Sequence, residues 1–198
     1  MSTDLLLEKT PSAPSRDFVT LKDYLAIAAK VEERIEYIDG ELFFMDGVTL
    51  FHGRIQTNVT VGLYNQLVAA EYAIFSSNVS VHIAPSAYFF PDLCVVRGAG
   101  QIARRGAALL NPALVVEVLS PSTAHKDLGV KLQRYREIPS LQHYLIIDQQ
   151  RVFVELHSRI DGVWTKRAFS DLDEEASLDS LGASLGLAQI YRGIDLAP

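Results

Sequence analysis

The sequence predicts an α+β fold in which helices flank a central mixed sheet. Short runs of β-branched and aromatic residues, bounded by Gly, Pro or Asp, are typical of strands. They alternate along the chain with segments whose apolar residues recur at helical spacing. A chain of 198 residues, 48% hydrophobic and 21% charged, is long enough for one substantial core. We expect a Ser- and Pro-rich flexible tail over residues 1–16 and one folded domain over residues 17–198.

The folded part is expected to begin with a helix, a hairpin and a longer helix. Residues Thr20–Asp23 resemble a capping box and open a short helix that runs to about residue 29. In Glu36–Phe44 the central Asp39-Gly40 pair supplies the positive φ angles of a tight turn, which predicts a β-hairpin. Apolar residues at helical spacing over about His52–Glu71 predict an amphipathic helix.

The remainder predicts strands with two further helices. Pro139 ends a helix expected over about Thr123–Arg136, and a short helix is expected near Leu187–Tyr191. The last three strands are joined by polar turns and predict a C-terminal meander. The expected strands are Ala73–Ile83, Tyr88–Val96, Ala113–Leu119, His143–Ile147, Arg151–His157 and Val163–Phe169.

Composition excludes several classes of protein. The single cysteine, Cys94, rules out an intramolecular disulfide and a cysteine-based zinc site. The N-terminus lacks the basic flank of a signal peptide, and no apolar run approaches a membrane span, so we expect a cytoplasmic protein without membrane contact. The net charge of −6 argues against a general nucleic-acid coat but allows a local basic rim around an acidic site.

Two carboxylates lie in hydrophobic surroundings. Glu117 interrupts the apolar run of the Ala113–Leu119 strand, and Asp92 stands at the start of another apolar segment. A buried carboxylate is costly unless it is paired, protonated or bound to a metal. If the two strands are neighbours, the acids converge, and a hard divalent cation between them would relieve their repulsion. The alternative is that Asp92 caps a turn after Pro91 while Glu117 pairs with an arginine.

A polar helix face follows the Glu117 strand. Asp127, Lys131 and Tyr135 are spaced by four residues and so share one face of the expected helix. A lysine beside a two-carboxylate metal site would complete the groups needed for phosphodiester cleavage, because its ammonium stabilises developing negative charge. The alternative is a solvated Asp–Lys pair of the kind found on many helices.

Together these motifs resemble a known family. Pro91-Asp92, the Glu117–Thr123 phrase EVLSPST and Lys131-x-x-x-Tyr135 are similar to the Uma-two type of restriction endonucleases, which belong to the PD-(D/E)xK nuclease superfamily. The early YIDGE hairpin adds to the resemblance, which covers roughly residues 20–195. The resemblance implies a restriction-endonuclease-like core and cleavage of DNA with Mg²⁺ or Mn²⁺.

The resemblance also implies roles for individual residues. Asp92 and Glu117 become metal ligands, with the backbone carbonyl of Val118 as a third. The superfamily lysine would stand two residues after Glu117, where this chain has Leu119, so the resemblance implies that Lys131 has taken over its task. Residues implied as polar neighbours of the site are Glu41, His52, Asp127 and Tyr135.

Other candidates and functions stay open. Arg104, Arg105 and His125 are weak candidates for contacts with nucleic acid, and Cys94 is expected to be a core residue near the site. His82, His143 and His157 lack metal-ligand spacing and are expected to be ordinary strand residues. Alternatives to a DNA endonuclease are a non-catalytic binding or oligomerisation module and a metal-dependent hydrolase of a smaller phosphate ester. Exposed apolar strands in the C-terminal meander suggest a homodimer.

Overall fold

The computed structural model describes residues 18–196, apart from positions 46, 68–70, 104–107 and 122. The tail expected over residues 1–16 lies outside the described residues. The helical segments are α1 (Leu21–Ala28), α2 (Leu50–Leu67), α3 (Ala124–Lys126), a π-helical turn (Asp127–Lys131), α4 (Leu132–Tyr135), a 3-10 turn (Asp179–Leu181) and α5 (Leu187–Ile190). The strands are β1 (Ile35–Ile38), β2 (Glu41–Phe44), β3 (Tyr72–Ser76), β4 (Val81–Ile83), β5 (Ala87–Phe89), β6 (Leu93–Arg97), β7 (Pro112–Leu119), β8 (His143–Asp148), β9 (Val154–Ile160), β10 (Val163–Phe169), β11 (Glu175–Leu178) and β12 (Ala183–Gly186).

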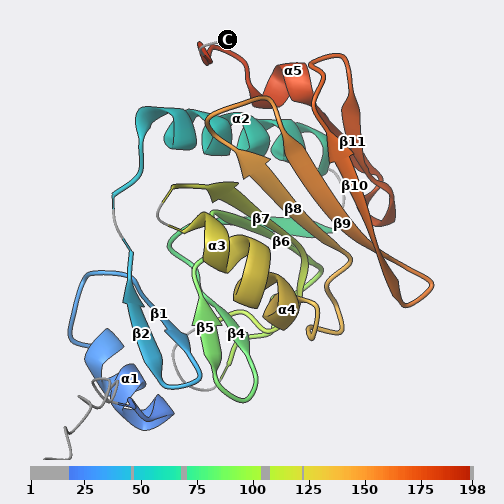
Figure 1. Cartoon of the computed structure of the whole chain (residues 1–198). Coiled ribbons are helices and arrows are strands. Elements are labelled where there is room, and N and C mark those ends of the chain that lie inside the picture. Colours follow the sequence, from blue (N-terminus) through green and yellow to red (C-terminus); the bar gives the residue numbers. More distant parts are fainter. Residues whose placement is uncertain (1–17, 46, 68–70, 104–107, 122, 197–198) are drawn as a thin grey trace, which may run out of the picture.

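A six-stranded mixed sheet forms the centre of the molecule (Figure 1). Its strand order is β10-β9-β8-β7-β6-β3. β7 and β8 run parallel, and the other neighbouring pairs are antiparallel. The α+β class with a central mixed sheet is therefore confirmed.

Two smaller sheets are attached to this centre. The N-terminal hairpin β1–β2 joins β5 and β4 in a sheet of order β2-β1-β5-β4, and β11 pairs with β12. The hairpin turn has the expected positive φ angles, +47° at Asp39 and +98° at Gly40. Thr20 caps α1 as expected, because its side chain accepts the N–H of Asp23 at 3.2 Å. No helix in the described part of the chain is both long and apolar enough to cross a membrane.

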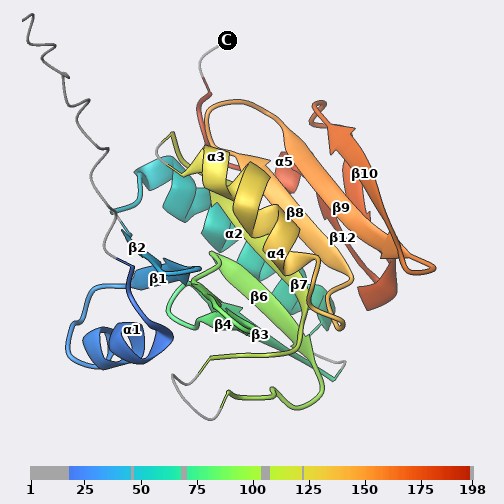
Figure 2. The same ribbon diagram turned by 60° about the horizontal axis from the view of Figure 1, so that its bottom comes forward.

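The central sheet is covered on both faces, as Figure 2 shows from a second side. On β7, Leu114, Val116 and Val118 pack with α2 and α5. The alternate residue Val115 packs on the opposite face with Tyr135 of α4. Successive strand side chains point to opposite faces, so Glu117 lies on the α4 side. Burial on both faces explains why the β7 sequence is almost continuously apolar.

The expected strands near residues 73–83 and 88–96 were each too long. The first breaks at a turn in which Val79 donates to the carbonyl of Ser76, and it becomes β3 and β4 in two different sheets. The second breaks at Pro91, which has no N–H to donate to a ladder, and becomes β5 and β6. This second break places Asp92 between the small sheet and the central sheet rather than on a strand.

Three more differences lie in the second half of the chain. The helix expected over residues 123–136 is interrupted by the π-helical turn, which is wider than an α-helical turn. The strand expected from Arg151 begins only at Val154, because Asp148 accepts the N–H of Gln150 at 2.8 Å and forms a turn there. The β11–β12 hairpin follows the expected meander and was not predicted.

Candidate active site

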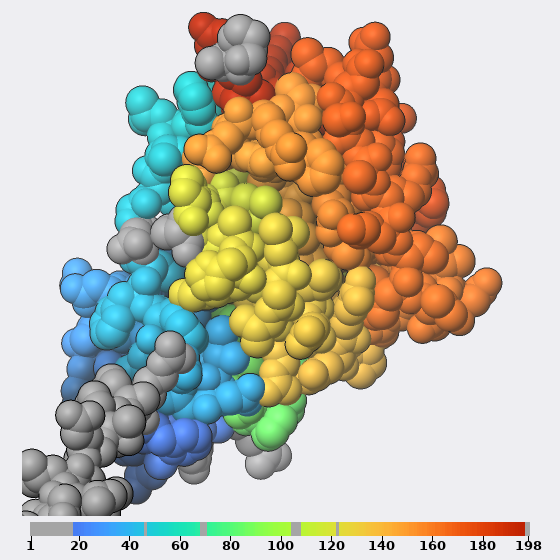
Figure 3. Space-filling view, in the orientation of Figure 1, coloured from blue at the N-terminus to red at the C-terminus, as the bar shows by residue number. Residues whose placement is uncertain are grey.

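The predicted catalytic and metal-binding residues Asp92, Glu117, Val118 and Lys131 line a pocket of about 120 Å³. The pocket lies where the end of β7 and the loop before β6 meet the first turn of α2, the β1–β2 hairpin and the α3–π segment. Figure 3 shows the α3–α4 segment, in yellow, on the outer surface between the N-terminal strands in blue and the C-terminal strands in orange.

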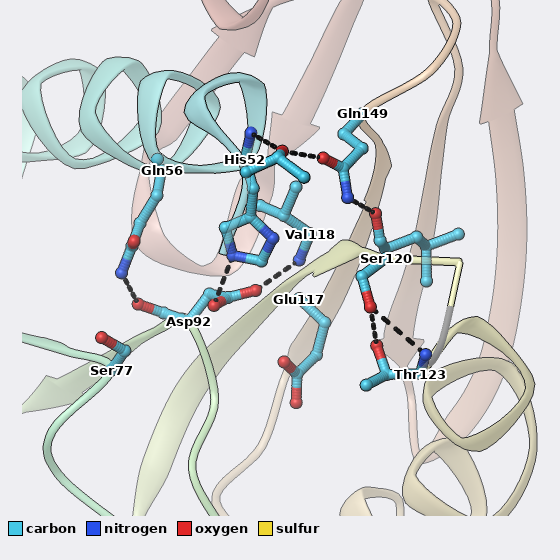
Figure 4. Close-up of polar contacts among 12 residues, drawn as sticks. His52, Gln56, Ser77, Asp92, Glu117, Val118, Ser120, Thr123 and Gln149 are labelled. Atoms are coloured by element: carbon cyan, nitrogen blue, oxygen red, sulfur yellow. Dashed lines mark hydrogen bonds and ion pairs between the residues drawn. The ribbon is translucent and has the colours of Figure 1, made fainter. Parts of the chain in front are cut away.

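Asp92 is fixed in the pocket wall by three hydrogen bonds (Figure 4). Its Oδ1 lies 2.8 Å from Nε2 of His52, and its Oδ2 accepts the backbone N–H of Val118 at 2.7 Å. Gln56, one turn after His52 on α2, donates to the main-chain carbonyl of Asp92 at 2.7 Å. Pro91 and these partners hold Asp92, a residue only 6% exposed, at one position beside β7.

Glu117 reaches the same pocket from near the C-terminal end of β7. Its neighbour Val116 pairs with Leu93, the residue after Asp92, so the antiparallel register sets the two acids beside each other. The Oε1 atom of Glu117 accepts the hydroxyl of Tyr135 and the ammonium of Lys131, each at 3.2 Å. The structure therefore brings Asp92, Glu117 and Lys131 into one buried cluster.

Lys131 is surrounded by carboxylates. Its Nζ lies 2.8 Å from Glu36, 3.2 Å from Glu117 and 3.0 Å from Asp127. The solvated Asp–Lys pair is thereby excluded, since Asp127 and Lys131 are 2% and 3% exposed. The π-helical turn carries both residues, four positions apart.

Burial and charge act against each other in this cluster. Burial raises the pKa of Glu117 well above that of an ordinary glutamate; Lys131 lowers it, but Asp127, Asp92 and Glu36 raise it further. Burial lowers the pKa of Lys131, yet its three carboxylate neighbours outweigh that effect and leave this pKa raised. Lys131 therefore stays an ammonium at neutral pH. Burial also raises the pKa of Tyr135 strongly, so its hydroxyl stays a donor.

The donor set suits a hard divalent cation. Among the described residues that line the pocket, the buried carboxylates of Glu36, Asp92, Glu117 and Asp127 face a single buried lysine. This excess of buried negative charge is costly without a further cation. The described residues contain no ready cluster of three His, Cys, Asp or Glu side chains around one point. Mg²⁺ needs only one or two protein carboxylates, because it keeps several waters, so Asp92 and Glu117 together could hold such an ion.

The main chain of Val118 also faces Asp92. Its N–H donates to the Asp92 carboxylate, and the N–H and C=O of one strand residue project toward the same side of the strand. The carbonyl of Val118 thus lies on the side of the strand that faces Asp92, where the family resemblance implied a third metal ligand. Each oxygen of Asp92 keeps a further lone pair beside the hydrogen bond it accepts, so these bonds leave room for a cation.

The other predicted residues are divided between the pocket and the rest of the molecule. His52, Asp127 and Tyr135 contact the cluster. Glu41 does not line the pocket, because it stands at the start of β2 beside the hairpin turn, whereas Phe43 and Phe44 at the other end of β2 line it. His125 is exposed on α3 and does not line it either. Arg104 and Arg105 lie outside the described residues.

The remaining single candidates are structural. Cys94 is a buried core residue, and burial together with Glu117 raises the pKa of its thiol to about 12, which makes it unreactive. His82, His143 and His157 lie on β4, β8 and β9, as expected for ordinary strand residues.

Several site residues were missed from the sequence. Glu36 was assigned only to the hairpin, although a carboxylate inside the apolar run Ile-Glu-Tyr-Ile was the same signal that identified Glu117. Thr123 Oγ1 donates to Asp127 at 2.9 Å and belongs to the EVLSPST phrase. A chain of contacts from His52 N–H through Thr49 and Gln149 to the carbonyl of Leu119 ties α2 to the end of β7, and no local pattern pointed to it.

A family model covers most of the chain. Residues 21–189 match the model of Uma2, described as "Putative restriction endonuclease". The chain belongs to the Uma2 family. The description of the family supports a nuclease, and hence a nucleic-acid substrate, for this chain.

Two relatives and a solved structure are also similar to this chain. The chain is similar to the uncharacterized protein slr1290 of Synechocystis sp., with 31% identity over 96% of this chain and 99% of that protein. It is also similar to the uncharacterized protein sll1609 of the same organism, with 35% identity over 74% and 84% of the two chains. A crystal structure from Anabaena variabilis, titled a "putative nuclease belonging to DUF820", has the same fold with a TM-score of 0.69 and 16% identity, covering 84% of this chain and 96% of that one.

Proposed function

We propose that this Uma2 protein is an endonuclease that hydrolyses DNA phosphodiester bonds with Mg²⁺ or Mn²⁺. The observation that carries the proposal is the buried cluster in which Asp92 and Glu117 line one pocket and Glu117 contacts Lys131 at 3.2 Å. Asp92, Glu117 and the carbonyl of Val118 would hold the cation. When bound, the cation would neutralise phosphate charge and lower the pKa of a coordinated water.

The protein residues would contribute binding and charge. Lys131 is an ammonium at neutral pH and would stabilise the negative charge that develops on the phosphate oxygens. His52 and Gln56 hold Asp92 by its side chain and its main chain, so the ligand would be positioned before substrate arrives. Tyr135 orients Glu117 through its hydroxyl.

Metal add-back to stripped protein tests the proposal. Cleavage of DNA should require Mg²⁺ or Mn²⁺, and Glu117→Gln should abolish it. No cleavage with any divalent metal would favour the non-catalytic alternative, and cleavage by the variant would place the activity outside this site. Competition by mononucleotides as strong as that by DNA would favour a hydrolase of smaller phosphate esters.

A homodimer remains a prediction. Ile160 and Val163, at the β9–β10 turn, are 54% and 65% exposed, and β10 is an edge strand of the central sheet. Sedimentation velocity would test it, and a monomer at high protein concentration would rule it out.

A further inference from the structure

The mouth of the pocket is aromatic and exposed. Phe44, the last residue of β2, lines the pocket and is 66% exposed. The ammonium of Lys126 lies over the ring of the adjacent Phe43, 3.9 Å from the ring centroid. A large exposed apolar side chain is unremarkable alone, but one that rims a polar, acidic pocket offers a surface on which a planar ligand can stack.

The acids lie deep beneath this rim. Asp92 and Glu117 are 6% and 4% exposed, and their pocket is a small volume of about 120 Å³. A phosphodiester that reaches them must leave the surface of its own helix. Duplex DNA is stiff over lengths of about 50 nm, so a duplex would pay a deformation energy to enter, whereas an unpaired strand bends freely.

Positive charge at the pocket is sparse. Apart from the buried Lys131, the basic residues among the described lining are Arg34 and Lys126. Arg34 donates to the carbonyl of Ser77 at 3.1 Å, and the chain carries a net charge of −6. Duplex binding draws its affinity mainly from many phosphate contacts, which this pocket does not offer. Stacking of bases on aromatic rings supplies affinity without them.

We infer that the pocket takes an unpaired DNA strand, with one base stacked on Phe44 and the adjoining phosphate drawn between Arg34 and Lys126 toward the buried acids. The inference rests on the proposed nuclease function, since it names the substrate class of the same site. In this arrangement Phe44 selects the substrate by stacking on a base, and Lys126 contacts the phosphate.

Binding measured without turnover tests the inference. Fluorescence anisotropy of the full-length protein in Ca²⁺ would compare a short labelled single strand with the same sequence as a blunt duplex. The single strand should bind at least about tenfold more tightly, and Phe44→Ala should weaken its binding by about tenfold, as expected for the loss of one stacked base. Phe44→Leu should also weaken single-strand binding, because leucine keeps apolar area but has no π face. Phe44→Trp should retain the binding.

Tyr64→Ala is the matched control. Tyr64 is an aromatic residue of α2, 56% exposed, that does not line the pocket, and its replacement should leave binding unchanged. Equal or tighter binding of the duplex, no effect of Phe44→Ala, or equal effects of both alanine variants would overturn the inference. Single-strand binding that depends on Phe44 but no cleavage with Mg²⁺ or Mn²⁺ would leave the substrate class standing and remove the nuclease proposal. Cleavage that prefers duplex DNA would overturn the inferred substrate class and leave the nuclease proposal standing.

Discussion

The ammonium of Lys131 and the carboxylate of Glu36 form an ion pair of 2.8 Å in the buried cluster. This is shorter than the 3.2 Å contact between Lys131 and Glu117. The same oxygen of Glu36 accepts the N–H of Phe90 at 3.1 Å, so Glu36 is itself held in place. The N-terminal hairpin thus reaches into the centre of the site and fixes the lysine there.

Glu36→Gln should slow cleavage without weakening metal binding. Glutamine keeps the shape of the side chain but removes the charge that anchors Lys131, so we expect about a tenfold loss in single-turnover rate. Glu36 also raises the pKa of Lys131, so the alkaline limb of the pH–rate profile should move to lower pH. Glu41→Gln, on the other strand of the hairpin, is the control. An unchanged alkaline limb would show that Glu36 acts only on folding.

The local sequence pattern was sufficient to predict most elements of the fold. The Asp39-Gly40 turn, the helical spacing of α2 and the apolar run of β7 are local features, and each element formed near its expected position. The misplaced boundaries have local causes that compete with strand propensity, as at Pro91 and at the Asp148 turn.

The site was harder to predict where it depends on tertiary pairing. Asp92, Glu117 and Lys131 were visible as charges in apolar or helical patterns. Glu36 was not singled out, because a hairpin strand normally exposes one face, and the residues that contact its buried carboxylate, Phe90 and Lys131, are distant in sequence. Glu41 on the other strand of the same hairpin is only half-buried and lies away from the pocket, which shows how little the local sequence distinguishes the two acids.

His143 should make the fold sensitive to acid. Burial lowers the pKa of its ring to about 4, from 6.5 for an unperturbed histidine. A histidine that is neutral in the folded protein contributes stability above pH 6.5 that is lost as the pH falls toward 4. Urea unfolding across this range should show the loss, and His143→Asn, which can keep the bond to Ser158, should show less of it. The same pH slope in both proteins would contradict the assignment.

Glu117→Gln should abolish Mg²⁺ binding in calorimetry while the metal-free protein keeps or gains stability. The folded pKa of Glu117 is raised, so the ionised carboxylate costs stability as the pH rises above the usual glutamate value of 4.5. Glutamine removes that cost, and Lys131 retains Glu36 and Asp127 as partners. The difference in melting temperature between variant and wild type should therefore grow with pH. A clear loss of stability in the metal-free variant would instead mark Glu117 as half of a structural ion pair.

Lys131→Ala should cut the cleavage rate by roughly 10²–10³-fold, the usual effect of losing one electrostatic stabiliser. Metal affinity should be nearly intact or higher, because the acids around Lys131 lose a competing cation. Melting curves should accompany the kinetics, and Lys131→Met, which keeps the length of the buried stem, separates the loss of charge from the loss of packing. Lys131→Arg should rescue poorly, since a planar guanidinium does not fit the space of a lysine that is 3% exposed.

Lys126→Ala is the control that tests the placement of the helix face. Lys126 lines the mouth of the pocket over Phe43, so its loss should weaken substrate binding and leave the single-turnover rate at saturation nearly unchanged. If Lys126 rather than Lys131 proves essential for that rate, the stabilising ammonium comes from the rim and the buried lysine serves only to neutralise acids. If neither matters, the protein does not use the chemistry of the PD-(D/E)xK superfamily, because the described residues that line the pocket contain no further lysine to replace them.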